Sequence, residues 1–198
     1  MPRKADAQLE GRILEAAYGL WRRNGGQGVT MRAVARAAGT TTPTLYERFR
    51  DKDDLLRLLR ERARRDLYSA IKSSRSTVEA CRKALDFFEA HPHEFQLISE
   101  DWATAFARKE PMPSFELLKV RLARELGGKR SDHMPLALAI VVLLNGTATL
   151  LHAEDVHDKI YRHFRHACLV ACETLIAASR KKIRPVKGNG DAGGERLQ

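Results

Sequence analysis

The chain reads TMRAVARAAG over residues 30–39 and TTTPTLYERF directly after it. This pattern is typical of two short helices joined by a tight turn. Thr30 has the side-chain oxygen that a helix N-cap requires. Gly39 stands where the first helix must end, and a glycine there adopts a left-handed conformation without steric strain. Thr41 or Thr42 can cap the second helix.

The second helix has one apolar side and one polar side. Pro43 suits its first turn, where a missing backbone N–H loses no hydrogen bond. Leu45 and Phe49 are four residues apart, so we expect both to turn inward against Val34 of the first helix. The side chains left outside are those of Thr42, Thr44, Tyr46 and Arg48. An exposed short helix with hydroxyls and a guanidinium is suited to the major groove of DNA.

The charge of the chain is concentrated near the same segment. The formal net charge is +10, of which residues 1–65 carry +7 and residues 181–198 carry +3, so residues 66–180 are neutral. A polyanion such as DNA is attracted to such a basic region. The alternative is that the basic residues only keep a small domain soluble.

Residues 9–56 resemble the DNA-binding domain of the TetR/AcrR family of bacterial transcriptional regulators. The resemblance is carried by Arg12-Ile-Leu-Glu-Ala-Ala17, by the Thr30 to Gly39 pattern, by Pro-Thr-Leu-Tyr46 and by Lys52-x-x-Leu55-Leu56. It implies a sequence-specific DNA-binding regulator that acts as a repressor and leaves a palindromic operator when a small-molecule ligand binds. It implies no enzymatic activity, no cofactor and no metal.

The expected fold is all-α, because helix-forming residues dominate and no run of alternating β-branched residues occurs. We expect a three-helix helix-turn-helix domain over residues 1–52 and a helical ligand-sensing and dimerisation domain over residues 53–180. A disordered basic, glycine-rich tail is expected over residues 181–198. Breakers and caps predict helices over residues 9–24, from 51 to 67 or beyond, from 76 or 77 to 90, over 94–108 and 114–126, from 131 or 132 to 152, and over 156–180.

The resemblance assigns DNA contacts one residue at a time. The residues expected to contact base edges are Arg32, Thr42, Pro43, Thr44 and Arg48. The residues expected to contact phosphates are Thr30, Thr41, Tyr46 and Lys52. The alternatives are that Tyr46 packs as a half-buried aromatic and that Arg32 and Arg48 are solvated charges.

The last two predicted helices are apolar enough to form a seam between two copies of the chain. The residues expected at a homodimer interface are Leu136, Ile140, Leu143, Leu144, Leu151, Phe164, Leu169, Cys172, Leu175 and Ile176. In a monomer the same residues would pack internally. Residues 134–151 are also nearly long enough to span a bilayer, but a buried helix is the favoured interpretation and no membrane partner is expected.

A pocket for an unknown small-molecule ligand is expected among the middle helices. Its candidate lining residues are Phe87, Phe95, Trp102, Phe106, Asn145 and His152. The alternative for each aromatic residue is ordinary core packing.

Three other interpretations remain open at this point. The first is a metal-dependent enzyme or a metal site, because His152, His157, His163 and His166 lie near one another in the sequence with several acidic residues. No His-Glu-x-x-His or Cys-x-x-Cys pattern accompanies them. The second is a redox pair formed by Cys168 and Cys172. Two cysteines four residues apart on a helix are usually too far apart for a disulfide, which favours a packing role for both. A nucleoid-type protein would bind DNA without sequence preference. Three cysteines and a polar N-terminus fit the cytoplasm.

Overall fold

The computed structural model describes residues 4–153 and 158–183, and this part of the chain is helical throughout with no strand. The N-terminal helices are α1 (Lys4–Gly28), α2 (Met31–Ala37), α3 (Thr42–Tyr46) and α4 (Lys52–Ile71). The others are α5 (Thr77–Ala90), α6 (Pro92–Glu100), α7 (Trp102–Ala107), α8 (Pro113–Leu126), the 3-10 helix η1 (Arg130–His133), α9 (Met134–Leu151) and α10 (Asp158–Ile183).

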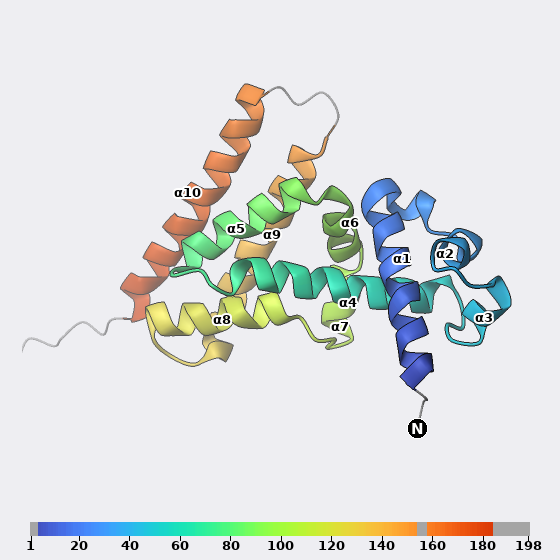
Figure 1. Ribbon diagram of the computed structural model, residues 1–198. Helices are drawn as coiled ribbons and strands as arrows, with labels where there is room; N and C mark the ends of the chain where they lie inside the picture. Colours follow the sequence, from blue (N-terminus) through green and yellow to red (C-terminus); the bar gives the residue numbers. More distant parts are fainter. Residues whose placement is uncertain (1–3, 154–157, 184–198) are drawn as a thin grey trace, which may run out of the picture.

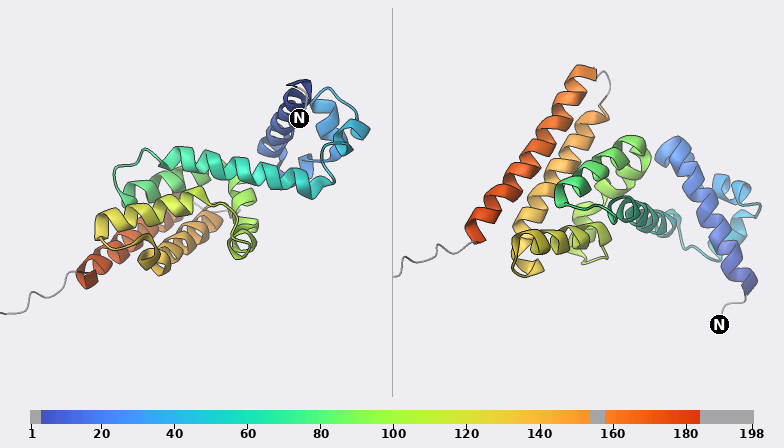
Figure 2. Two further views of the ribbon diagram at one scale, coloured as in Figure 1. Left: turned by 90° about the horizontal axis from the view of Figure 1, so that it is seen from below. Right: turned by 60° about the vertical axis from the view of Figure 1, so that its left-hand side comes forward.

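Helix α4 joins the two ends of the molecule. Figure 1 shows α1, α2 and α3 grouped around one end of α4, while α5, α8, α9 and α10 lie around its other end. In the left view of Figure 2 the N-terminal helices project away from the rest of the protein, and α9 and α10 lie far from them. A displacement of α4 would therefore change its contacts with the N-terminal helices and with the remaining helices together.

Each predicted helix has an observed counterpart, but α1 begins at Lys4, five residues before its predicted start, and α9 is preceded by the 3-10 helix η1. Two further differences lie inside helices. Residue Gly25 interrupts α1 with a φ of 59°, so the helical turn that follows it, to Gly28, was not anticipated. The single helix predicted over residues 94–108 is two helices, α6 and α7, which meet at Asp101. The carboxylate of Asp101 is bound by Arg64 of α4, 3.2 Å away, which fixes this corner against α4.

Helix α10 covers most of the predicted last helix and continues to Ile183. The remainder of the predicted tail, residues 184–198, lies outside the described residues, as do residues 154–157. The predicted disorder of the tail therefore stays a prediction.

Helix α9, together with η1, is long and apolar enough to cross a membrane by length and composition alone. In the protein it packs against α10, α5 and α8. Ala137, Ile140, Leu144, Ala148 and Leu151 of α9 are buried there, so this helix serves as a core element on that side.

Candidate DNA interface and ligand cavity

Helix α2 begins and ends as the sequence predicts. The Thr30 hydroxyl accepts a hydrogen bond from the Ala33 N–H, 3.1 Å away, and so caps the helix. At the other end Gly39 has a φ of 65°, and the Thr40 N–H donates to the Ala35 carbonyl at 2.9 Å. The backbone is thus turned by a glycine in the left-handed region, which sets the angle between α2 and α3.

Helix α3 is anchored by buried apolar side chains and has a side-chain cap at its first turn. The Thr41 hydroxyl accepts from the Thr44 N–H at 3.3 Å and lies 2.9 Å from the Thr44 hydroxyl. Leu45 and Phe49 are buried, with 0% and 1% of their surface exposed, in the same apolar core as Val34 of α2. These few apolar residues orient a helix of only five residues.

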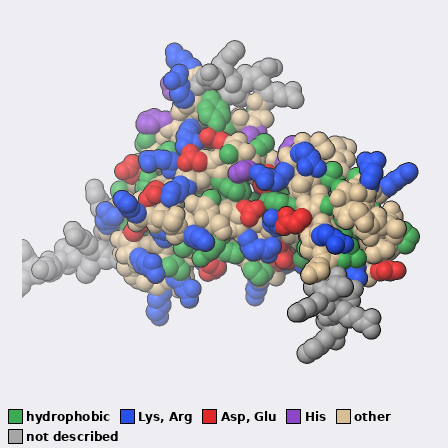
Figure 3. Space-filling view, in the orientation of Figure 1, with side chains coloured by type: hydrophobic (Ala, Val, Ile, Leu, Met, Phe, Trp, Pro, Cys, Tyr) green, Lys and Arg blue, Asp and Glu red, His purple; other side chains and the backbone are tan. Residues whose placement is uncertain are grey.

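The side chains predicted to contact bases and phosphates lie on the surface of this unit. Tyr46 is 53% exposed, so about half of its surface is open to solvent at this face. The exposed residues are Thr30, Arg32, Thr41, Pro43 and Tyr46, and those partly exposed are Thr42, Thr44, Arg48 and Lys52. Figure 3 shows Lys and Arg side chains standing out at the upper right, over the N-terminal helices.

Lys52 is placed by a contact within the protein. Its ammonium lies 3.4 Å from the carbonyl oxygen of Gly26, at the end of α1. This hydrogen bond uses one of the three N–H donors of the ammonium. The others stay available for a phosphate near the first turn of α4.

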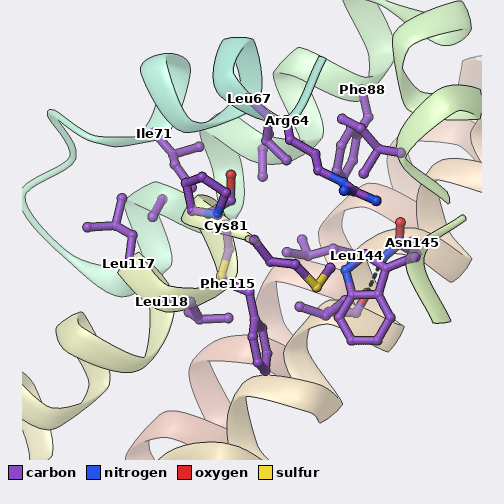
Figure 4. A pocket seen from close by; sticks show the side chains of 18 of the residues that line it. Arg64, Leu67, Ile71, Cys81, Phe88, Phe115, Leu117, Leu118, Leu144 and Asn145 are labelled. Atoms are coloured by element: carbon purple, nitrogen blue, oxygen red, sulfur yellow. Dashed lines mark hydrogen bonds between the residues drawn. The ribbon is translucent and has the colours of Figure 1, made fainter. Parts of the chain in front are cut away.

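A cavity of about 80 Å³ lies between α4, α5, α8 and α9 (Figure 4). Its wall is almost wholly apolar. The main apolar contributors are Leu67, Ala84, Phe88, Ile98, Phe115 and Leu144. The sequence did not anticipate these residues, except for Leu144, which was assigned to the dimer interface.

Trp102 and Asn145 are the predicted pocket residues that line this cavity. Phe95 is part of the core and Phe87 packs against Phe88 and His91. Phe106 stacks on Trp102 at the surface, with ring centroids 5.3 Å apart. His152 is exposed and contacts Phe95. These four do not line the cavity.

Arg64 is the unexpected member of the cavity wall. It is 5% exposed, and its terminal nitrogens donate to Glu110 at 3.0 Å and to Asp101 at 3.2 Å. In the sequence Arg64 stands in an arginine-rich run that resembles a solvated helix face, so its burial was not foreseen.

Comparison with known proteins identifies the N-terminal unit. Residues 13–59 match the model of the family described as bacterial regulatory proteins, tetR family. This domain belongs to the TetR family.

Solved structures extend the likeness of this chain beyond its N-terminal domain. The transcriptional regulator SCO7222, a TetR from Streptomyces coelicolor, has 20% identity over 87% of this chain and 98% of its own, with a TM-score of 0.63. A TetR variant from Acinetobacter baumannii AYE, in complex with minocycline, has 16% identity over 89% of this chain and 98% of its own, with a TM-score of 0.61. BioQ has 22% identity over 85% of this chain and 98% of its own, with a TM-score of 0.60.

No curated protein sequence matches the chain. The structural neighbours nevertheless share the fold over 85–89% of this chain, and those named above include regulators of the TetR family. The resemblance stated from the sequence and the all-α fold class are both confirmed.

The residues predicted at the dimer interface divide into two groups. Ile140, Leu144, Leu151, Cys172 and Ile176 are buried inside the protomer itself. Leu136, Leu143, Phe164 and Leu169 are partly buried and Leu175 is 36% exposed. The large apolar side chains that α9 and α10 expose more fully are Val142, Leu150, Ile160 and Val170.

The three cysteines of the chain lie together and are all free thiols. Cys172 hydrogen-bonds with Cys168 of its own helix and with Cys81 of α5. The bond with Cys168 lowers the pKa of Cys172, but the bond with Cys81 and burial outweigh it and raise that pKa to about 12. Such thiols stay protonated, which fits a packing role.

The histidine-rich region shows no metal centre where it can be described. Among residues 4–153 and 158–183, no group of three or more His, Cys, Asp or Glu side chains is arranged to hold a metal ion. His163 and His166 are exposed, and a ring nitrogen of His163 contacts the Lys159 carbonyl at 2.6 Å. His157 lies outside the described residues.

Proposed function

We propose that the chain is a homodimeric repressor of the TetR family that acts in the cytoplasm, binds a palindromic operator and leaves it when a small molecule occupies the cavity. The observation that carries the proposal is that α4 forms part of the cavity wall and also holds the DNA-binding domain. Arg64, Leu67 and Ile71 line the cavity. Arg62 and Asp66, interleaved with them on the same helix, bind Glu15 and Tyr18 of α1.

A second helix gives the cavity another link to α1. Ile98 of α6 lines the cavity, while Glu94, one turn earlier on the same helix, is 4% exposed and binds Arg22 of α1 at 2.7 Å. The Trp21 indole N–H also donates to the His93 carbonyl at 2.6 Å. A displacement of α6 therefore moves the end of α1.

The size of the cavity supports control by displacement. About 80 Å³ is roughly half of an engineered cavity that admits benzene. A ligand of one ring or more must move the wall, and a ligand shifts the equilibrium between two arrangements only by binding one of them better. We expect the occupied arrangement to separate the two DNA-binding domains from their operator spacing.

Dimerisation is expected through the outer faces of α9 and α10. Val142 is 68% exposed and Val170 is 46% exposed, although both lie on helices whose opposite sides are core. A two-fold pairing of these faces would remove the exposed apolar side chains from water and present two recognition helices to a palindrome.

The proposal is tested first by selecting bound sequences from a random DNA pool and titrating the selected site at two salt concentrations. We expect a palindromic motif. The substitution Arg32→Ala is expected to weaken specific binding by about tenfold or more and to relax specificity at one position in each half-site, because bidentate base contacts are worth about 1–3 kcal/mol.

Arg180→Ala is the matched control, since it removes an exposed arginine near the end of α10, far from the recognition unit. Binding with no enriched sequence would instead indicate a nonspecific DNA-binding protein, with a steep salt dependence as its only signature.

Dimerisation has its own test. Val142→Glu is expected to convert the protein to a monomer in sedimentation measurements and to lower operator affinity, because a charge would be buried in an apolar interface. Ala107→Glu, on the exposed face of α7, is the control. A dimer that persists in Val142→Glu contradicts this interface.

A further inference from the structure

The cavity wall contains polar atoms that have no partner within the described protein. The Nε–H of Arg64 and the Oδ1 of Asn145 are both buried and make no hydrogen bond. A buried polar atom without a partner is destabilising by about 1–3 kcal/mol, so such atoms mark places where another molecule gains by binding.

The orientation of Asn145 is fixed by its other end. Its Nδ2 donates to the Val141 carbonyl at 3.0 Å, and only the NH2 side of the amide can do this. The Oδ1 is therefore the atom left over, and it can only accept a hydrogen bond. Figure 4 shows the guanidinium of Arg64 and the amide of Asn145 pointing toward one another at the same end of the cavity.

The charge of Arg64 is already balanced. Its two terminal nitrogens bind the carboxylates of Glu110 and Asp101, and Asp101 also has Arg60 at 3.9 Å. Two cations thus face two anions around this end of the cavity. A ligand carboxylate at this end of the cavity would bring in a third anion with no nearby cation left to compensate it. The other arginine of the wall, Arg121, donates to the Ile71 and Lys72 carbonyls, about 10 Å farther along α4.

The free Nε–H needs an acceptor and the free Oδ1 needs a donor. A hydroxyl group provides both, whereas a carboxylate or an ether only accepts. The rest of the wall is mainly apolar, with Leu67 and Ile71 following Arg64 along α4 over about 10 Å at 1.5 Å per residue. Ser114 and Arg121 also line it, and the buried Oγ of Ser114 and Nε of Arg121 have no hydrogen-bond partner either. The complementary molecule therefore has an apolar body and one hydroxyl at its end.

We propose that the cavity binds a neutral, compact, mainly apolar compound with a hydroxyl group, such as a phenol, whose oxygen accepts from Arg64 Nε–H and whose hydrogen is donated to Asn145 Oδ1. This deepens the proposed function by naming the ligand class of the same cavity, and it rests on that function for its biological meaning. The binding itself is independent of DNA.

The test uses three probes that share one ring and one methyl group, namely toluene, p-cresol and p-toluate. Each is titrated into the full chain by calorimetry. We expect p-cresol to bind at least tenfold more tightly than toluene, because two otherwise unpaired atoms gain partners. We expect p-toluate to bind at least tenfold more weakly than p-cresol.

Two variants assign the effect to the two polar atoms. Asn145→Leu removes the acceptor, and Arg64→Lys keeps the positive charge beside Asp101 and Glu110 while removing the Nε–H. In both, the preference for p-cresol over toluene is expected to fall to about threefold or less. The ratio of two affinities is unaffected by a general change in stability. Asn24→Leu, on the exposed face of α1, should leave the ratio unchanged.

Three results would overturn the ligand class: equal binding of toluene and p-cresol, tightest binding of p-toluate, or no binding of any probe at millimolar concentration. A separate titration of the protein–operator complex distinguishes the two proposals. If p-cresol binds with the expected preference but operator affinity does not change, ligand control fails and the ligand class stands. If operator binding is intact and p-toluate is preferred, only the ligand class fails.

Discussion

The N-terminal domain and the cavity region are both built from helices, but they differ in how tightly those helices are packed. In the N-terminal domain a few side chains, among them Leu45 and Phe49, are packed with almost no exposed surface and hold two short helices rigidly. Around the cavity, α4, α5, α8 and α9 leave about 80 Å³ unfilled and several polar atoms unpaired. A recognition surface gains from fixed geometry, whereas a site that must respond to a ligand gains from a wall that can still move.

Truncating one leucine in each region is the most direct way to break this comparison. Leu45→Ala is expected to destabilise the fold by about 3–5 kcal/mol, because its well-packed surroundings cannot close over the space. Leu67→Ala, in the cavity wall, should cost about 2 kcal/mol, since its neighbours already tolerate empty volume. Urea denaturation of the two variants measures the difference, and equal losses would contradict it.

Removing one helix cap in each region sharpens the comparison on the functional side. Thr30 caps α2, and Ser76 caps α5 by accepting from the Glu79 N–H at 3.1 Å. Either Thr30→Ala or Ser76→Ala should lower stability by about 1 kcal/mol. Only Thr30→Ala is expected to weaken operator binding as well. If the Ser76→Ala protein is fully folded and still binds the operator more weakly, the cap of α5 also contributes to DNA binding and the expected difference between the two regions is wrong.

A pair of glycines tests whether the rigid turn depends on backbone conformation. Gly39 has a φ of 65° with open space around it, so Gly39→Ala should destabilise by about 1 kcal/mol through strain alone. Gly11 is in α1 with nothing near its position, so Gly11→Ala should stabilise by about 0.5–1 kcal/mol. Melting temperatures that move in the same direction for both would refute the backbone argument.

The smallest expected effect concerns pH at the edge of the cavity region. His152 is exposed as a residue, but part of its surface is covered, and this partial desolvation lowers its pKa. A hydrogen bond with the Phe88 backbone and the charge of Glu89 offset the effect only in part. A lowered pKa in the folded state gives stability that is complete above the unfolded value of about 6.5 and is lost as the pH falls. The wild-type protein should lose slightly more stability than His152→Gln between about pH 7.5 and pH 5.5, as thermal melts would show. A larger loss of stability in His152→Gln would contradict a lowered pKa of His152 in the folded protein.

The N-terminal domain could be predicted from sequence because its determinants are local. Thr30, Gly39 and Thr41 act within four residues of themselves, so their caps and turn are visible in the chain. Leu45 and Phe49 share one face of one short segment. Nothing distant is needed to place them.

The cavity could not be predicted in detail because it depends on how helices rotate against one another. Phe87 and Phe88 are neighbours in the sequence, and only packing of α5 decides that Phe88 faces the cavity. Helix α9 is apolar on every side, so the sequence could not tell that Ile140 and Leu144 turn inward while Val142 turns out. The burial of Arg64 could not be predicted either, because its ion-pair partners Asp101 and Glu110 are distant from it in the chain.

The small volume of the cavity has a consequence for kinetics. We expect a compound larger than about 80 Å³ to fit only after the helices around the cavity have moved apart. At high ligand concentration the observed rate of binding should then stop rising and equal the rate at which the wall opens. The lag before a regulated gene responds would be set by this opening rate, a property of the protein's own motion that the supply of ligand cannot shorten.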